Sequence, residues 1–311
     1  MSIIRHCPVC GQQNTRALYQ PKRSPGLVSK CLHCSMIYIA SIEEDHSLIF
    51  DGPVTYGDVS PKILTSSSLE DVKDLWEFTF LPNKEAEWPA LRENALDALQ
   101  RIETHIHKPP LERSILDFGS GWGFFLAVAK ERQWITFGLE PLTTCSVYAR
   151  ATFGLDIVTN TLREGLLPPN SFDVITSFQV FEHLPYPERD IQILGKALRP
   201  DGLILIEVPN IETWTVRLSK ARHRHFVEDH INFFSKKTLG RLLEKNGLKV
   251  IDRYHPVRRM SVRHLFERWI PSIMPASIAG TFQNLLRKTS LWDRTVGINV
   301  NDILGMVACR L

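Results

Sequence analysis

The chain has 311 residues, 43% hydrophobic and 23% charged, with 17 Gly and 19 Pro. This composition is typical of a globular protein with one large or two modest domains, and it excludes a disordered, collagen-like or low-complexity chain. The net charge of +3 is too small to predict nucleic-acid binding from bulk charge. Because the sequence has no apolar run long enough to span a membrane and does not begin with a secretory signal, we expect a cytoplasmic protein.

Four of the six cysteines form two C-x2-C pairs that are separated by 20 residues. These four residues are Cys7, Cys10, Cys31 and Cys34. Four thiolates at this spacing are typical of a tetrahedral zinc site. Since four protein ligands leave no position open for water, we predict a structural zinc in a small ribbon domain over residues 1–42, which needs the metal to fold.

Residues 43–110 are predicted to be a connector with N-terminal helices. Turn-forming sequences such as Asp51-Gly52-Pro53 occupy its first part, and no regular element is predicted there. From Ala86 onward, apolar residues recur at helical spacing until Pro109 and Pro110 end the pattern. One helix is therefore expected before the next domain begins.

Residues 111–311 alternate short apolar runs with helical stretches. Helices are predicted at 124–133, 188–198 and 236–246, the last with Ser235 as N-cap and Gly247 as its left-handed end. Strands are predicted at 114–118, 135–140, 156–159, 172–178, 203–208, 248–253 and 303–308. Strands and helices that alternate with short connections predict an α/β fold, a doubly wound and mainly parallel seven-stranded sheet.

The most informative motif is a glycine loop between the first strand and its helix. Gly119, Gly121 and Gly123 allow the backbone to turn tightly and to approach a ligand closely. Nineteen residues after Gly121, the second strand ends at Glu140, where a carboxylate can accept both hydroxyls of a ribose. The spacing is G-x-G-x-G rather than the dinucleotide pattern, and Asp117 precedes the loop. An acid at that place suits a cationic nucleotide better than a pyrophosphate.

On these residues the sequence resembles the class I S-adenosylmethionine (SAM)-dependent methyltransferases, which have a Rossmann-like fold. The resemblance covers residues 114–311 and continues through four further segments. They are Leu167-Pro168-Pro169-Asn170-Ser171-Phe172-Asp173-Val174-Ile175, Phe181-Glu182-His183-Leu184, the run from Leu198 to Asn210, and Asp229-His230-Ile231-Asn232-Phe233-Phe234-Ser235.

The resemblance implies a SAM site. Asp117, Gly119 and Gly121 would line the methionine end of the cofactor, and Glu140 would hold its ribose. Near the adenine and at the border between donor and acceptor, the implied residues are Thr161, Leu162, Phe178 and Gln179.

Two histidines are candidates for a general base in methyl transfer, and each has a structural alternative. His183 follows the fourth strand and either removes a proton or simply orders the loop before Pro185. His230 is the second candidate, and its structural alternative is a packed core histidine. Ubiquinone-pathway O-methyltransferases, which residues 179–183 resemble, have Glu where this chain has Gln179, so we predict no catalytic metal.

An N-terminal ribbon before a SAM domain resembles bacterial methyltransferases for sugars and other small metabolites. It also resembles rRNA guanine methyltransferases, whose finger spacing differs. We therefore expect a small-molecule acceptor, such as a metabolite, sugar or glycan precursor. The alternatives are an RNA methyltransferase that binds RNA through the ribbon, a nucleotide-dependent oxidoreductase and a catalytically inactive SAM-binding scaffold.

An insertion at residues 255–298 separates the last two predicted strands. From residue 255 to the end, eight basic residues face three acidic ones, a net charge of +5. Arg258–Ile270 is predicted to be an amphipathic basic helix that packs on the domain. It could alternatively act as an acceptor lid, or contact an anionic membrane or carrier. The oligomeric state is left open.

Overall fold

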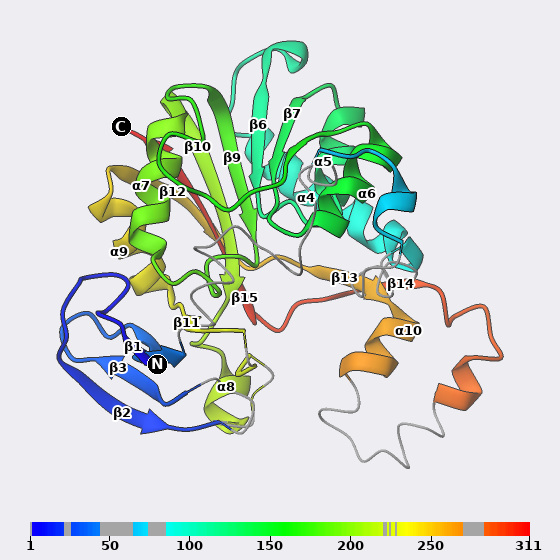
Figure 1. Ribbon diagram of the computed structural model, residues 1–311. Coiled ribbons are helices and arrows are strands. Elements are labelled where there is room, and N and C mark those ends of the chain that lie inside the picture. The colour runs from blue at the N-terminus through cyan, green and yellow to red at the C-terminus, as the bar shows by residue number, and fades with distance from the viewer. Residues whose placement is uncertain are drawn as a thin grey trace.

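A seven-stranded sheet forms the centre of the computed structural model (Figure 1). The structure describes residues 2–21, 26–43, 65–73, 85–219, 223, 225–227, 229–269 and 283–311. In spatial order the strands are β12 (Leu248–Tyr254), β15 (Ile303–Arg310), β10 (Leu198–Pro209), β9 (Phe172–Phe178), β6 (Ser114–Phe118), β7 (Ile135–Leu139) and β8 (Asp156–Val158). Only β15 runs antiparallel to its neighbours. The predicted mainly parallel sheet is therefore confirmed.

Helices cover both faces of this sheet, because alternate strand residues point to opposite sides. On one face Ile115 packs in a core with residues of α4 (Trp88–Glu103), α5 (Phe124–Glu131) and α6 (Thr143–Phe153). On the other face Leu116 packs with α7 (Pro187–Ala197) and α9 (Lys236–Lys245). The two helix groups lie on opposite sides in Figure 1. The predicted N-cap is also confirmed, since Ser235 forms a capping box with Thr238.

The N-terminal ribbon is joined to the larger domain by a shared sheet. Its strands are β1 (Ser2–Ile4), β2 (Thr15–Tyr19), β3 (Val28–Cys31), β4 (Ile37–Ile39) and β5 (Ser41–Glu43). The short strand β11 (Asn232–Phe233) pairs with β4 and completes the order β11-β4-β3-β2. Met36 and Tyr38 belong to the same core as Leu239 and Leu242 of α9. Figure 1 shows the ribbon, in blue, beside β11.

The insertion differs from its prediction. Arg258–Ser261 is strand β13, paired with β14 (Thr295–Ile298), and helical structure begins only with α10 (Val262–His264) and the π-helical turn Leu265–Trp269. The prediction of an amphipathic helix over Arg258–Ile270 was therefore wrong for its first four residues. These residues form a strand because they pair with β14, and because the side chain of Asn94 on α4 both donates to and accepts from the backbone of Arg259, at 2.9 Å each.

The remaining elements connect these layers. They are the 3₁₀ turns Leu69–Asp71 and Pro110–Glu112, and α8 (Trp214–Ser219). No helix among the described residues is long and apolar enough to cross a membrane. Residues 270–282 of the insertion and most of 44–84 in the connector lie outside the described residues. The strand order reverses between β6 and β9, and in open α/β sheets ligands bind at such a point, beyond the carboxyl ends of the strands.

Candidate active site and metal centre

The glycine loop follows β6 and has the backbone conformation that its sequence predicts. Gly119, Gly121 and Gly123 have φ angles of 79°, 51° and 80°, in the left-handed region that favours glycine. A Cβ atom at Gly119 would lie 2.4 Å from a methyl group of Val180, so a side chain is excluded there. A Cβ at Gly121 would meet no atom within 4 Å. The loop therefore packs tightly on one side and leaves open space on the other.

Glu140 at the end of β7 is tied to this loop. Its carboxylate accepts hydrogen bonds from the backbone N–H groups of Gly121 at 2.7 Å and Leu142 at 2.8 Å. The side chain is buried, and burial raises the pKa of its carboxyl group to about 7. Each carboxylate oxygen retains a second lone pair that can accept from a ligand hydroxyl.

Asp117 is the second buried acid beside the loop. It is only 2% exposed and accepts a hydrogen bond from the Thr176 hydroxyl at 2.7 Å. Burial raises the pKa of its carboxyl group to about 7, and the nearby charge of Glu140 acts in the same direction. Two buried carboxyl groups next to an open loop fit a ligand that brings positive charge and hydroxyl donors, as SAM does.

Two cavities meet at the carboxyl ends of β6 and β9. The smaller has a volume of about 350 Å³ and the larger about 690 Å³. Both are lined by Gly119, Phe178 and Gln179, the residues that connect them. Among the other sequence-predicted residues, the smaller cavity is lined by Glu140, Thr161, Leu162 and His183, and the larger by Asp117. Gly121 lines neither described cavity, but its N–H donates to Glu140. The structure thus brings the predicted cofactor residues together, while their individual roles stay predictions.

Gln179 at the junction has two unusual properties. Its φ angle is 57°, a left-handed conformation that is uncommon for residues other than glycine. Strained backbone conformations of this kind are concentrated at functional sites. Its amide Nε2 is buried and has no hydrogen-bond partner among the described residues. The hydroxyl of Ser120, which lines the larger cavity, is also buried without a hydrogen-bond partner among the described residues. Unpartnered donors in a cavity wall fit a polar ligand.

Sequence reasoning missed several residues of the larger cavity, among them Glu207, Tyr254 and Arg258. They come from β10, β12 and β13, and the Tyr254 hydroxyl donates to Glu207 at 2.9 Å. The available signal was Glu207, a single acid within the apolar run 203–208. The position of Arg258 had no such signal, because it depends on the pairing of β13 with β14.

The two candidate histidines lie against each other, with ring centroids 4.7 Å apart. His183 Nδ1 is 2.8 Å from the carbonyl of Asp229, and His230 Nδ1 is 2.9 Å from that of His225. Each neutral ring therefore carries its proton on Nδ1 and has Nε2 as the basic nitrogen. His183 lines the smaller cavity, whereas His230 is not among the residues that line either described cavity.

Glu182 stands beside this pair as a third titratable group. It is fully buried, and neither carboxylate oxygen has a hydrogen-bond partner among the described residues. Burial raises the pKa of its carboxyl group to about 7. One ligand atom each from Glu182, His183 and His230 lie within 4.8 Å of one another, so these residues can hold a metal ion. The absence of a catalytic metal therefore stays a prediction.

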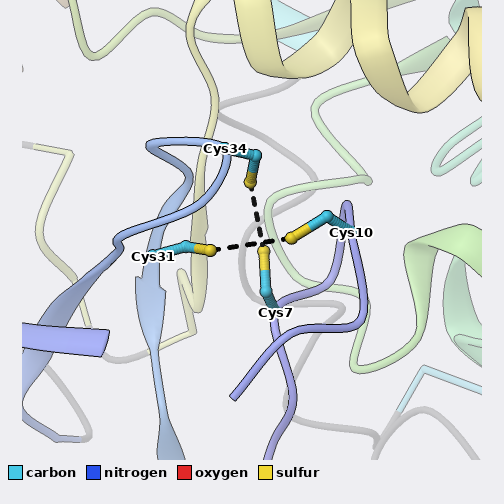
Figure 2. Close-up of side chains that lie close together, drawn as sticks. All are labelled: Cys7, Cys10, Cys31 and Cys34. Atoms are coloured by element: carbon cyan, nitrogen blue, oxygen red, sulfur yellow. Dashed lines mark hydrogen bonds between the residues drawn. The ribbon is translucent and has the colours of Figure 1, made fainter. Parts of the chain in front are cut away.

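The four cysteines converge as a metal centre should (Figure 2). The sulfur atoms of Cys7 and Cys34 are 3.4 Å apart, and those of Cys10 and Cys31 are 3.6 Å apart. Tetrahedral zinc with Zn–S bonds of about 2.3 Å needs sulfur atoms roughly 3.8 Å apart. Backbone N–H groups hold the pKa of Cys31 at about 7 although burial opposes this. Burial raises the pKa of Cys34 to about 11 and that of Cys7 far above its usual value.

Both knuckles close in the same way. The N–H of Gly11 donates to the carbonyl of Cys7 at 2.9 Å, and the N–H of Ser35 donates to that of Cys31 at 3.0 Å. Gly11 and Ser35 are both left-handed, with φ of 72° and 67°. Ser35 thus adopts a conformation for which glycine is preferred. The second knuckle therefore has the same backbone turn as the first, although it has serine in place of glycine.

Purified protein is expected to contain one equivalent of tightly bound zinc, measured by elemental analysis. Cys31→Ser should lose the metal, because three thiolates and a hydroxyl bind zinc far more weakly. Cys309→Ser, which changes a thiol outside the cluster, should retain the full equivalent. A Cys31→Ser variant with undiminished zinc content would contradict the proposed ligand set.

The fold and the loop geometry define the class I, Rossmann-like methyltransferases. A family model described as a methyltransferase domain matches residues 88–253. This match extends over more than half of the chain, and the protein therefore belongs to this methyltransferase family.

Curated relatives agree with this family. A ubiquinone biosynthesis O-methyltransferase from Colwellia psychrerythraea is 29% identical over 164 residues, 47% of this chain and 66% of the relative. A probable S-adenosylmethionine-dependent methyltransferase from Mycolicibacterium smegmatis is 28% identical over 167 residues, 53% of this chain and 63% of the relative. The chain spans less than two thirds of the length of these relatives.

A solved structure shares the fold at low sequence identity. It is a chain of the complex between the Haloferax volcanii Trm112 methyltransferase activator and a putative methyltransferase. The TM-score is 0.51 at 15% identity, with 78% of this chain and 97% of that chain covered. This likeness concerns the fold alone.

Proposed function

We propose that the protein transfers a methyl group from SAM to a small-molecule acceptor. The observation that carries the proposal is the meeting of two cavities at Gly119, Phe178 and Gln179. SAM would occupy the smaller one, with its adenine near Thr161 and Leu162 and its ribose on Glu140. The sulfonium would then lie at the junction.

The acceptor would bind in the larger cavity. Its volume of about 690 Å³ is within the range of small-molecule sites, roughly 300–1,000 Å³. One of the relatives named above, the ubiquinone biosynthesis O-methyltransferase, has a name that fits a small-molecule acceptor. The carboxylate of Glu207 and the guanidinium of Arg258 would orient the polar groups of the acceptor.

In this mechanism SAM supplies the methyl group and the leaving group, so the protein mainly aligns the reactants. His183 would remove the acceptor proton through Nε2, while its Nδ1–H is held by the Asp229 carbonyl. Of the two histidines, His183 is favoured because it lines a cavity that reaches the junction. His230 would support the ring of His183 from the side.

The test uses methyl-labelled SAM with an extract of host cells, separated afterwards into RNA, low-mass and lipid fractions. Label in the low-mass or lipid fraction supports the proposal and provides material for identifying the acceptor. Label in nuclease-sensitive RNA would instead favour an RNA methyltransferase. If SAM binds and no fraction is labelled, the chain is an inactive SAM-binding scaffold.

SAM affinity is expected to rise with pH between about 5.5 and 7.5. In the free protein burial raises the pKa of the Asp117 and Glu140 carboxyl groups to about 7, so both are largely protonated below that pH. The cationic and hydroxyl groups of SAM favour the ionised forms, and binding must then release protons. An affinity gain of about tenfold or more is expected over this interval, with a plateau above it.

Titration calorimetry in two buffers of different ionisation enthalpy measures both the affinity and the released protons. Glu140→Gln should weaken SAM binding by about 10–100-fold at pH 8, as expected for charged hydrogen bonds, and reduce the proton release. Glu131→Gln, at an exposed position on α5, is the matched control. Wild-type affinity in Glu140→Gln would disprove the ribose assignment.

A further inference from the structure

We propose that Arg5 in the zinc ribbon is a positioning residue for the active site, and that it holds the two histidine-bearing segments together. These segments are residues 181–185, the β9 loop, and residues 229–233, the β11 segment. The inference rests on the proposed function, because it assigns catalysis to His183.

Arg5 is a buried arginine whose guanidinium has only neutral acceptors. It is 5% exposed, and burial lowers its pKa to about 10. None of its hydrogen bonds within the described residues goes to a carboxylate. The accepting atoms and their distances are the carbonyls of Ile39 (3.1 Å), Ile231 (3.4 Å), Leu184 (3.5 Å) and Pro185 (2.9 Å), and Oδ1 of Asn232 (2.8 Å).

The guanidinium therefore connects three parts of the chain at once. One terminal nitrogen donates to the ribbon at Ile39 and to the β11 segment at Ile231. The other donates to the β9 loop at Pro185 and to Asn232. Burying a cation among neutral carbonyl groups costs free energy. A guanidinium group can donate to several acceptors at once, because its N–H donors are fixed in one plane.

Asn232 extends this connection toward the histidines. Its side-chain amide donates to the carbonyls of Phe181 at 2.9 Å and Leu184 at 2.7 Å. The carbonyl of Glu182 also accepts from the backbone N–H groups of Ile231 and Asn232. His183 lies between these anchored residues, and its Nδ1 reaches the Asp229 carbonyl of the opposite segment.

The ribbon backbone fixes Arg5 itself. The N–H of Arg5 donates to the carbonyl of Ala40 at 2.8 Å, and the N–H of Ile39 donates to that of Ile231 at 2.9 Å. Strand β4 pairs with β11 through Tyr38 and Asn232. The ribbon is thus hydrogen-bonded to both segments that carry the histidines, although none of its residues is among those lining the two described cavities.

The test is Arg5→Lys, which keeps the charge and removes the fork. We expect full zinc content and unchanged SAM affinity, with kcat lowered about 10–100-fold, since small misplacements of a reacting group cost this much. The pH profile of kcat and the imidazole NMR resonances of His183 and His230 should also shift. Asn232→Ala should have the same effects, because it removes the side chain that accepts a hydrogen bond from Arg5.

Arg16→Lys is the control, because Arg16 is exposed on β2 of the same ribbon. The proposal is overturned if Arg5→Lys and Asn232→Ala keep wild-type kcat and unshifted resonances. It is also overturned if SAM affinity falls together with kcat in both variants, which would indicate a general folding role. If the wild type transfers no methyl group, the proposed function has failed, and the histidine resonances still decide the role of Arg5.

Discussion

A His183→Gln variant is expected to retain SAM binding and to lose about 10²–10⁴-fold in kcat. The loss follows because the side-chain amide cannot accept the acceptor proton as the imidazole Nε2 does. SAM binding should persist because Glu140 and the glycine loop remain intact. Single-turnover rates with labelled SAM measure the chemical step, and equilibrium dialysis measures the affinity.

Two further variants show whether the effect is specific. His230→Gln should cost less, about tenfold, because His230 lines neither of the two described cavities. His107→Gln, at an exposed position, should have no effect. The base role would be contradicted if mild chelation that spares the ribbon zinc abolished activity and a divalent cation restored it. A metal on Nε2 would occupy the lone pair that the base needs, and Glu182, His183 and His230 would then be its ligands.

The second large effect concerns stability. Asp173 is the second residue of β9 and is 6% exposed, and its carboxylate accepts from Lys108 at 2.5 Å and Arg199 at 2.6 Å. The N–H and hydroxyl of Ser114 on β6 also donate to it, at 2.9 and 2.8 Å. Asp173→Asn should therefore lower the free energy of unfolding by about 3 kcal/mol, because it removes the negative charge that pairs with two cations and replaces one acceptor oxygen by an NH2 donor.

The pH dependence of unfolding gives an independent readout. Burial opposes ionisation of Asp173, but hydrogen bonds from Lys108, Ser114 and Arg199 outweigh it and hold the carboxyl pKa at about 2. Because this folded-state pKa lies below the unfolded value of about 3.9, the stabilisation is complete above about pH 5 and is lost as the pH falls through about 2. Asp173→Asn should lose this acid-limb dependence, and Asp156→Asn on the exposed edge of β8 should keep it. Equal stability of Asp173→Asn and wild type in denaturant would disprove the account.

Sequence reasoning succeeded where local pattern and packing agree. The glycine loop, the N-cap at Ser235 and the short apolar strands are each determined by residues close in the chain. It failed at Arg258–Ser261, where spacing suggested a helix and pairing with a distant strand produced β13. Arg5 had no sequence signal either, because its acceptors are backbone carbonyls, which every residue carries.

The pairing of β4 with β11 also bears on the order in which the chain can fold. The ribbon is synthesised first, yet its sheet is completed by a strand from far along the sequence, and Arg5 and Ile231 are separated by 226 positions. During synthesis the edge of β4 has no strand partner, and Arg5 lacks its acceptors at Ile231 and Asn232, until residues 231–233 have been made. A zinc ion bound by the four cysteines would assemble the two knuckles early, so that the ribbon could fold before the larger domain packs against it.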